Sequence, residues 1–420
     1  MTAAAAETHR AIDAIWRIES AKIVAGLTRM VRDVSLVEEL AQDALVAALE
    51  NWPAGGIPEK PGAWLMTTAK NRALDRLRRK KLIAEKHQEV GRDLEMEQNT
   101  VPDLAAALDD DIGDDLLSLM FTACHPVLSA EARVALTLRL IGGLSTGEIA
   151  RAFLVPEATI AQRIVRAKRS IAEAGVAFEV PRGPDRAARL ASVLGVIYLV
   201  FNEGYAATAG DDWMRPQLCE EALRLGRILA ELAPGEPEVH GLVALMEVQA
   251  SRIGARTAPD GAPILLLEQN RARWNRLLIR RGLAALDRAG KLGGAAGSYA
   301  LQAAIAACHA RAATADDTDW ARIAALYAAL AIVQPSPIVE LNRAVAISFA
   351  LGPATALAIV DELVDEASLK SYHLLPSVRG DLLHRLGRHE EARAEFERAA
   401  SMTQNEREKA LLLARAEQSA

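Results

Sequence analysis

The sequence predicts an all-α protein. Hydrophobic residues make up 51% of the chain and aromatic residues only 4%. Alanine and leucine dominate, whereas runs of alternating β-branched residues are scarce. Apolar residues recur at helical spacing along most of the chain, and clusters of proline and glycine interrupt these stretches. Composition and periodicity together favour helices over sheets.

The chain of 420 residues is long enough for two or three domains with sizeable cores. Cys124, Cys219 and Cys308 lie far apart, with no CxxC motif and no histidine pair at ligand spacing. We therefore expect buried thiols in a reducing cytosol, and no metal or cofactor. The longest apolar run, residues 190–201, is shorter than the about 20 residues that cross a bilayer. With no signal-peptide pattern at the start, these features predict a cytoplasmic protein that does not enter a membrane.

Charge is segregated along the chain, although the net charge is only -6. Residues 70–86 contain eight cations and two anions, whereas residues 89–115 contain one cation and ten anions. Basic segments suit phosphates, and an acidic segment between them suits a connector kept away from DNA. The pattern predicts nucleic-acid-binding units joined by an acidic linker at residues 88–112.

The first unit, residues 8–87, is predicted to contain two prominent helices. In "SLVEELAQDALVAALENW" the apolar positions Leu36, Leu40, Ala44 and Ala48 form a helical stripe, and Ser35 is placed to cap the helix with Glu38 at the capping-box position. Proline and glycine at residues 53–62 then break the helix. The next helix, "AWLMTTAKNRALDRLRRKK", directs four residues inward, namely Leu65, Ala69, Ala73 and Leu77. Thr67, Asn71 and Arg78 share the opposite face, with Asp75 beside them.

The second unit, residues 113–175, contains a predicted helix-turn-helix in "LSTGEIARAFLVPEATIAQRIVRAK". Ser145 and Glu148 are placed to form a capping box, and Pro156 suits the start of the second helix. The buried stripe of that helix is predicted to be Ile160, Ile164, Ala167 and Ile171. Its N-terminal turn would aim Glu157, Ala158 and Thr159 at base edges in a major groove. Gln162 and Arg163 could reach bases or phosphates, and Arg166 and Arg169 phosphates. From this motif alone, an amphipathic helix pair with a solvated cationic face remains an alternative.

Residues 187–420 are predicted to form an irregular array of helical hairpins. With Gly387 at the turn of "GDLLHRLGRHEEARAEFERAA", the packing positions of a tetratricopeptide repeat fall on Gly380, Ala392, Phe396 and Ala399. A weaker copy places Gly352 and Ala356 at similar positions. In "FNEGY", Glu203 with Tyr205 could mark a site, but a helix end capped by Gly204 is the simpler interpretation.

The helix-turn-helix resembles region 4 of bacterial RNA polymerase sigma factors. The resemblance rests on the helix at residues 133–140, the "GLS..EIA" entry and the "T......RAK" recognition helix. Upstream, "VEELAQDALVAALENW" resembles the core-binding helix of sigma region 2. "PGAWLMTTAKNRALDRLRRKK" resembles the helix that reads the promoter -10 element, since Asn71 is followed by Asp75 and an arginine cluster. Region 2 followed directly by region 4 is the layout of extracytoplasmic-function (ECF) sigma factors. "RLASVLGVIYLVFNEGYAAT" and the long tail are similar to the subgroup with a tetratricopeptide-like C-terminal extension.

This resemblance implies a sigma factor, which is not an enzyme. Its expected partners are core RNA polymerase, through the β′ clamp helices and β flap, promoter DNA, and a regulatory protein on the extension. The expected domains are region 2 at 8–87, the acidic linker at 88–112, region 4 at 113–175 and the extension at 187–420. This chain departs from the family pattern at Leu45, where the family often has an aromatic residue. It also departs at Ala161 and Gln162, where basic residues or serine are common in the family.

The resemblance also assigns the site residues. Contacts to the basic clamp helices fall on Glu38, Glu39, Gln42 and Asp43. Contacts to single-stranded -10 DNA fall on Lys70, Asn71, Arg72, Asp75, Arg76, Arg78, Arg79 and Lys80. Contacts to the -35 element fall on Glu157, Ala158, Thr159, Gln162, Arg163, Arg166 and Arg169. Asp75 could instead orient an arginine, and Trp64 could stack on a base or be buried.

Two other classes of function remain open. A helix-turn-helix regulator with a tetratricopeptide-like effector domain would bind promoters without gripping core polymerase. An enzyme hidden in the tail would need a polar cluster around Glu203.

Overall fold

The computed structural model describes the backbone of residues 3–31, 33–90, 112–259 and 261–419. The side chains of residues 3–6, 80–90, 112 and 209 lie outside this description, as does nearly all of the predicted acidic linker. Within the described residues the protein is nearly all helical, which confirms the predicted fold class. The only strands in the described part of the chain are two residues long each: β1 (Ala209–Gly210) pairs in parallel with β2 (Gln404–Asn405).

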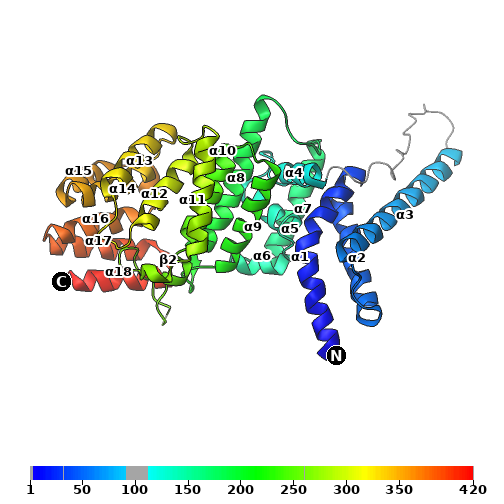
Figure 1. Ribbon diagram of the computed structural model, residues 1–420, viewed down its shortest axis with the longest axis horizontal. Helices are drawn as coiled ribbons and strands as arrows, with labels where there is room; N and C mark the ends of the chain where they lie inside the picture. The colour runs from blue at the N-terminus through cyan, green and yellow to red at the C-terminus, as the bar shows by residue number, and fades with distance from the viewer. Residues whose placement is uncertain (1–2, 32, 91–111, 260, 420) are drawn as a thin grey trace. The chain divides into compact units, whose positions relative to one another are not determined.

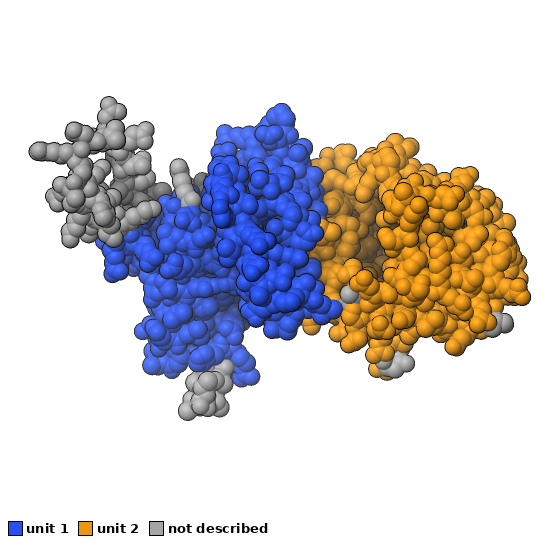
Figure 2. Space-filling model, turned by 180° about the vertical axis from the view of Figure 1, so that it is seen from behind, with its two compact units in different colours: residues 1–196 blue, residues 197–420 orange. Residues whose placement is uncertain are grey.

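The chain divides into two compact units, residues 1–196 and 197–420 (Figure 2). The helices of the first unit are α1 (Ala3–Val31), α2 (Val34–Gly55), α3 (Pro61–Val90), α4 (Ile112–Ala123), α5 (Ala130–Leu140), α6 (Thr146–Ala152) and α7 (Glu157–Glu173) (Figure 1). Helix α1 packs on α2, α3 and α4, whereas α5 and α6 pack on α7. The boundary between the units falls within α8 (Pro184–Tyr205).

Helices α2 and α3 form close to where the sequence predicts them. Leu40, Ala44 and Ala48 of α2 and Leu65, Ala69 and Ala73 of α3 are buried, as predicted, whereas Leu36 and Leu77 are only partly buried. The interruption between α2 and α3 is shorter than the proline and glycine at residues 53–62 predict. Helix α2 continues through Pro53 to Gly55, and Gly56, with a φ of 84°, then reverses the chain and donates its N–H to Trp52 O over 2.9 Å.

The second unit is a succession of helical hairpins. Its helices are α9 (Pro216–Leu232), α10 (Pro237–Ala250), α11 (Arg276–Lys291), α12 (Ser298–Arg311), α13 (Trp320–Val333), α14 (Pro337–Ala350), α15 (Pro353–Leu363), α16 (Leu374–Arg385), α17 (His389–Met402) and α18 (Glu406–Gln418). Three 3₁₀ turns lie between them: η1 (Ile253–Ala255), η2 (Arg271–Arg273) and η3 (Ala367–Leu369). Most of these helices pack on their neighbours in sequence (Figure 1). Apolar clusters therefore follow one another along the array.

The α16–α17 hairpin uses the residues that the repeat pattern singles out. Gly387 lies in the turn with a φ of 76°, and Ala392, Phe396 and Ala399 are buried. A Cβ on Gly380 would lie 3.0 Å from the Phe396 ring, so any larger residue would require the ring to shift by a few tenths of an ångström. The hairpin packs as predicted, while its likeness to a tetratricopeptide repeat stays a prediction.

Among the described residues, one helix is long and apolar enough to cross a membrane by length and composition alone, and that helix is α8. The sequence prediction considered only its apolar run of twelve residues, which is shorter than the helix. Core helices pass the same test, and Val193, Val200 and Phe201 of α8 are at most 1% exposed within the protein. The burial of these side chains favours a core role for α8.

Candidate nucleic-acid interface

The first helix of the predicted helix-turn-helix begins with a full capping box. The Glu148 N–H donates to Ser145 Oγ over 3.2 Å, and the Ser145 N–H donates to Glu148 Oε2 over 2.8 Å. Both bonds satisfy N–H groups that a helix start leaves without partners. The predicted cap is therefore confirmed, and it fixes where α6 begins.

A tight turn sets the angle between α6 and α7. Leu154 has a φ of 50°, which side chains other than glycine rarely adopt. The Val155 N–H bonds to Ala150 O over 3.1 Å across this turn. Pro156 is the N-cap of α7, and Glu157 follows in its first turn. The turn thus delivers the N-terminus of α7 to the surface.

Helix α7 is strongly two-sided, as predicted. Its buried residues are the predicted stripe of Ile160, Ile164, Ala167 and Ile171. Of the -35 candidates, five are exposed and two are partly buried: the exposed ones are Glu157, Ala158, Gln162, Arg166 and Arg169, and the partly buried ones are Thr159 and Arg163. Arg169 pairs with Glu173 over 2.6 Å on the exposed surface. The solvent face of α7 therefore offers cations along its length and small or polar groups at its N-terminus.

The start of α2 differs from the prediction. Asp33, and not Ser35, caps the helix, because Asp33 Oδ1 accepts the N–H groups of Ser35 and Leu36 over 2.9 and 3.2 Å. An aspartate accepts such bonds as well as a serine, and it lies one residue before the first helical residue. Glu38 is consequently free of the capping role and points elsewhere.

The acidic candidates of α2 lie beside the basic candidates of α3. Asp43 pairs with Arg72 over 3.4 Å, and Glu39 pairs with Arg76 over 3.6 Å. All four side chains are more than a third exposed, so each pair contributes little to stability. The sequence assigned these groups to two separate partners, but the structure places them on one continuous surface.

The remaining α3 candidates follow the same surface. Asn71, Arg78 and Arg79 are exposed, and Lys70 is partly buried. Asp75 lies 3.9 Å from Arg78, so it is placed to orient that arginine, although both side chains are largely exposed. The Lys80 side chain lies outside the described residues. At the start of α3, the rings of Trp64 and Trp52 meet edge to face at 5.3 Å.

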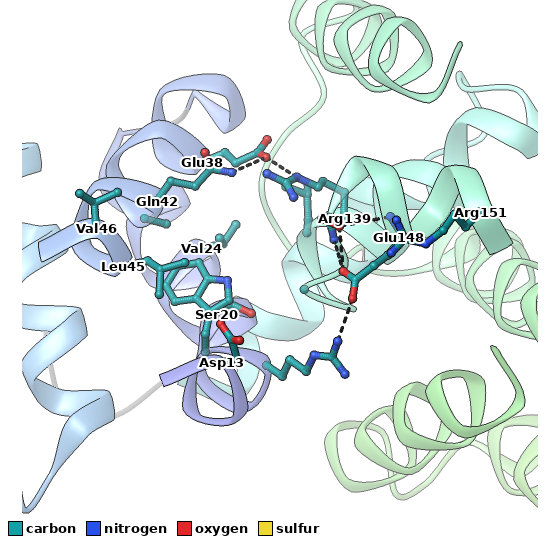
Figure 3. Close-up of a pocket in the computed structure, with 16 residues that line it drawn as sticks. Asp13, Ser20, Val24, Glu38, Gln42, Leu45, Val46, Arg139, Glu148 and Arg151 are labelled. Carbon is teal, nitrogen blue, oxygen red and sulfur yellow. Dashed lines mark hydrogen bonds and ion pairs between the residues drawn. The ribbon is translucent and has the colours of Figure 1, made fainter. Parts of the chain in front are cut away.

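Glu38 joins α2 to the helix-turn-helix. It pairs with Arg139 of α5, which Figure 3 draws, and also with Lys168 of α7. All three side chains are less than a fifth exposed. Burial alone would raise the pKa of Glu38, but the contacts with Lys168 and Arg139 outweigh burial and hold the pKa below its ordinary value. We call this group of three side chains the Glu38 clasp. The sequence places Glu38 on or beside the exposed face of its helix, whereas in the structure its carboxylate contacts two cations of the same unit.

A second contact supports the same arrangement. Arg17 of α1 pairs with the capping-box residue Glu148 over 2.8 Å, and both side chains line a cavity of about 510 Å³ with Glu38, Gln42 and Arg139 (Figure 3). Burial would raise the pKa of Glu148, but its bonds to Ser145 and the nearby Arg17 and Arg151 lower it. Neither contact was predicted, because the partners lie 101 to 131 residues apart in the sequence.

The predicted glycine cap at the end of α8 is wrong. Gly204 lies within the helix, and a Cβ there would come within 2.6 Å of the Cys219 backbone nitrogen. Its purpose is close packing and not a left-handed turn. Glu203 pairs with Arg215 and accepts from Thr208 over 2.9 Å, so this carboxylate serves an ion pair within the second unit.

The cysteines are buried thiols in the structure. Burial raises the pKa of Cys124 to about 11 and that of Cys219 to about 12, and it also raises the pKa of Cys308. Such thiols are poor nucleophiles near neutral pH. Among the described residues, no group of three or more His, Cys, Asp or Glu side chains is arranged to hold a metal ion.

Comparisons with known families identify three parts of the chain. Residues 19–83 match sigma-70 region 2, and residues 118–171 match sigma-70 region 4. Residues 189–290 match a family of unknown function (DUF6596). The first two matches include α2, α3 and α5 to α7, which carry the surfaces described above. Sigma-70 domains of these two kinds imply binding to core RNA polymerase and promoter DNA, and they belong to a non-enzymatic family.

Two relatives cover different lengths of the chain. The probable ECF RNA polymerase sigma factor SigI of Mycobacterium tuberculosis is 28% identical over 181 residues, which is 42% of this chain and 60% of SigI. The uncharacterized protein R00370 of Rhizobium meliloti (strain 1021) is 46% identical over 388 residues, which is 92% of this chain and 90% of R00370. The protein therefore belongs to one family with R00370, and through its two sigma-70 domains it is a distant homologue of ECF sigma factors.

Proposed function

We propose that this protein is a sigma factor of the ECF type that directs promoter-specific initiation and is controlled by its C-terminal extension. The observation that carries the proposal is the ordered pair of sigma-70 domains, each with a charged, exposed helical surface. As a sigma factor the protein acts inside the cell, at the promoter.

Helix α7 is suited to the -35 element. With its N-terminal turn in the major groove, Glu157, Ala158 and Thr159 face base edges, while Arg166 and Arg169 approach phosphates. Its buried stripe fixes the helix on α5 and α6, so the exposed face is held in one orientation. A rigid reading helix keeps the cost of ordering side chains on DNA low.

Helices α2 and α3 are suited to two partners that meet at one place. Glu39, Gln42 and Asp43 offer carboxylates and an amide to basic clamp helices. Asn71 can both donate to and accept from a base edge, and the arginines of α3 can contact phosphates. Since Asp43 and Glu39 lie against Arg72 and Arg76, polymerase binding would take carboxylates from these arginines and leave them available to the -10 strand.

The Glu38 clasp represents a closed form of the sigma unit. The -10 and -35 elements are about 25 base pairs apart, roughly 85 Å along B-form DNA. Helices that are joined through Glu38 and Lys168 cannot serve both elements at once. We propose that polymerase opens the clasp by offering Glu38 a basic partner outside the chain. Glu38 then loses its contacts with Arg139 and Lys168 and pairs with basic groups of the polymerase instead.

Transcription in vitro with purified core polymerase tests the function. Core enzyme with the full-length protein should form a holoenzyme and give discrete transcripts from a genomic promoter library. A helix-turn-helix regulator would instead bind DNA alone and leave core polymerase unbound. Failure to form a holoenzyme, together with the lack of any specific transcript, would overturn the proposal.

A further inference from the structure

The second unit contains a cavity of about 540 Å³ whose lining is unusual in charge. Among the described residues that line it, Arg252 and His309 are the only basic ones, and none is acidic. Tyr198 and Asn202 of α8 and Asn342 of α14 lie on its walls. The space-filling view shows that this unit is hollowed on one face (Figure 2). Cavities of this size suit small ligands or short chain segments.

Arg252 lacks the anion that a partly buried guanidinium normally has. Its Nε is buried without a hydrogen-bond partner, and the side chain forms no ion pair with any of the described residues. Its nearest charge-stabilising neighbours are the rings of Tyr205 and Trp274, whose centroids lie 5.8 and 5.9 Å from the guanidinium carbon. Rings offset only a small part of the cost of burying a cation.

Two further buried arginines make the surroundings of Arg252 more positive. Arg256 bonds to Tyr205 O and lies 3.6 Å from the centroid of the Tyr205 ring. Arg271 bonds to His309 O, to Ala312 O over 3.0 Å and to Thr318 Oγ1 over 3.2 Å. These hydrogen-bond and ring partners carry no charge, and among the described residues only the more distant carboxylate of Asp317 partly offsets the charge of Arg271. Burial lowers the pKa of Arg256 and of Arg271, and the nearby Arg252 lowers both further.

His309 responds to the same field. Burial, followed by Arg252 and Arg271, lowers the pKa of His309 to about 3, so the ring is neutral at physiological pH. The side chain is only 8% exposed, and its Nδ1 has no hydrogen-bond partner. One cavity therefore holds two buried polar groups without partners in a positive field, and a bound anion would satisfy the excess charge.

The other polar groups indicate what carries that anion. Five carboxamides line the cavity, four of them on α8, α10, α12 and α14 and one at the C-terminal end of α13, namely Asn202, Gln249, Gln302, Asn342 and Gln334. Each offers a donor and an acceptor with the spacing of a peptide group. Gln302 already accepts from the Tyr198 hydroxyl over 3.2 Å, whereas Gln334 and Asn342 are exposed at the rim. Tyr327 and Tyr372 add flat faces.

We propose that this cavity binds a peptide carboxylate, with Arg252 paired to the carboxylate and the carboxamides bonded to the peptide groups. A guanidinium binds a carboxylate through two parallel hydrogen bonds. A phosphate would favour several cations or a nest of backbone N–H groups, and this lining offers one guanidinium. The inference deepens the proposed regulatory role of the extension and rests on it, since a bound peptide would be the controlling signal.

Selection from a random octapeptide library with free C-termini tests the proposal on the full-length chain. The wild type should enrich peptides with a carboxylate at one fixed position, whereas Arg252→Gln should not. Arg280→Gln, which removes an exposed arginine of α11 outside the cavity, is the matched control and should enrich the same peptides as the wild type. In calorimetry, replacing the selected carboxylate by an amide should weaken binding to the wild type about 10-fold or more. The same replacement should change binding to Arg252→Gln little.

A second variant keeps the test decisive if Arg252→Gln is unstable. Asn342→Asp places a negative charge at the exposed rim, and it should weaken binding of the carboxylate peptide more than binding of the amide peptide, which loses only one hydrogen bond. The selected sequence is also placed inside a carrier protein or at the C-terminus of that carrier. Comparing the binding of these fusions with that of the free peptide distinguishes a free peptide ligand from a segment of a protein. The proposal fails if no carboxylate is selected, if Arg252→Gln selects the same peptides, or if inorganic phosphate or nucleotides compete equally well. Because the assay contains neither polymerase nor DNA, its failure is separate from a failure of sigma activity.

Discussion

At Glu38 a single carboxylate neutralises two cations from a different domain of the first unit. Removing one member of such a group leaves the others partly buried without compensation, which costs more than the pair itself contributes. Arg139 retains a bond to Leu144 O over 3.1 Å, whereas Lys168 has no partner other than Glu38 among the described residues. Lys168 is thus the residue most affected by a change at Glu38.

Glu38→Gln should loosen the contact between α2 and α7. We expect the first unit to lose about 2–4 kcal/mol of stability, somewhat less than a fully buried pair would lose, because some water reaches these side chains. Hydrogen exchange of amides at the start of α2 and the end of α7 should become faster. Glu39→Gln is the matched control: its side chain is 58% exposed and, among the described residues, pairs only with Arg76, so exchange should stay the same. Equal exchange in both variants would show that the clasp does not hold these helices together.

The Glu38 clasp should also be sensitive to acid. Since the folded pKa of Glu38 lies below its ordinary value of 4.5, the clasp stabilises the fold fully above about pH 4.5. That contribution is lost as the pH falls through the folded pKa, where the carboxylate becomes protonated. The stability difference between wild type and Glu38→Gln should therefore be constant near neutral pH and shrink in acid. Denaturant titrations at several pH values measure it, and a difference that grows in acid would contradict the assignment.

At the scale of single helices, α7 presents positions that should behave in two ways on DNA. Arg166→Ala should weaken binding to -35 DNA about equally for all sequences and reduce the salt slope by about one. Substitutions at Glu157 or Thr159 should instead change the preferred bases, by roughly 1–3 kcal/mol per base. Binding titrations over several salt concentrations and a set of altered sites measure both effects. An unchanged salt slope for Arg166→Ala would mean that α7 does not lie in the groove as proposed.

Variants in α2 and α3 should separate polymerase binding from DNA binding only in part, because acidic side chains of α2 pair with arginines of α3. The double variant Glu39→Ala and Asp43→Ala should weaken holoenzyme formation about 10-fold or more, because carboxylates facing basic helices are lost. The control for the change in net charge combines Glu7→Ala with Asp13→Ala, both at exposed positions of α1, which also removes two carboxylates. Competition with wild-type protein for core polymerase measures the effect. If the control and the double variant compete equally, the clamp contact lies elsewhere.

The sequence predicts these helices well because their faces are set locally. The α7 stripe follows from helical periodicity, and the α6 cap from a serine and a glutamate three residues apart. The errors occur at residues whose packing or partners depend on groups far away in the sequence. Gly204 looked like a cap, but the backbone at Cys219 requires a glycine there. Glu38 looked exposed, but it meets Arg139 and Lys168, whose proximity no local pattern reveals. The unpaired Arg252 is likewise a product of tertiary packing.

At the scale of the whole molecule, α8 complicates the boundary between the sigma domains and the extension. Its first half belongs to the first unit: Ser192 donates to Cys124 O over 2.6 Å, and Arg189 donates to Phe121 O over 3.1 Å. Arg133 of α5 donates in turn to Ser192 Oγ over 2.5 Å. The predicted start of the extension at residue 187 would remove these partners from the helix-turn-helix domain. The position of that boundary is open to experiment.

Two truncations should therefore behave differently. A chain ending at Arg182 loses Arg189 and Ser192, which leaves Cys124 O and Phe121 O without those donors and exposes the apolar surface under Leu190 and Val193. A chain ending at Val196 keeps all four side chains. We expect the longer chain to unfold at a temperature several degrees higher, since each lost buried bond costs about 1–3 kcal/mol.

Both truncated chains should still bind core polymerase through region 2, with transcription altered relative to the full-length protein because the extension is gone. Thermal unfolding and in vitro transcription of the three proteins measure these effects. If the two truncations unfold alike, α8 belongs wholly to the extension, and if both transcribe like the full-length protein, with and without cell extract, the extension has no regulatory role.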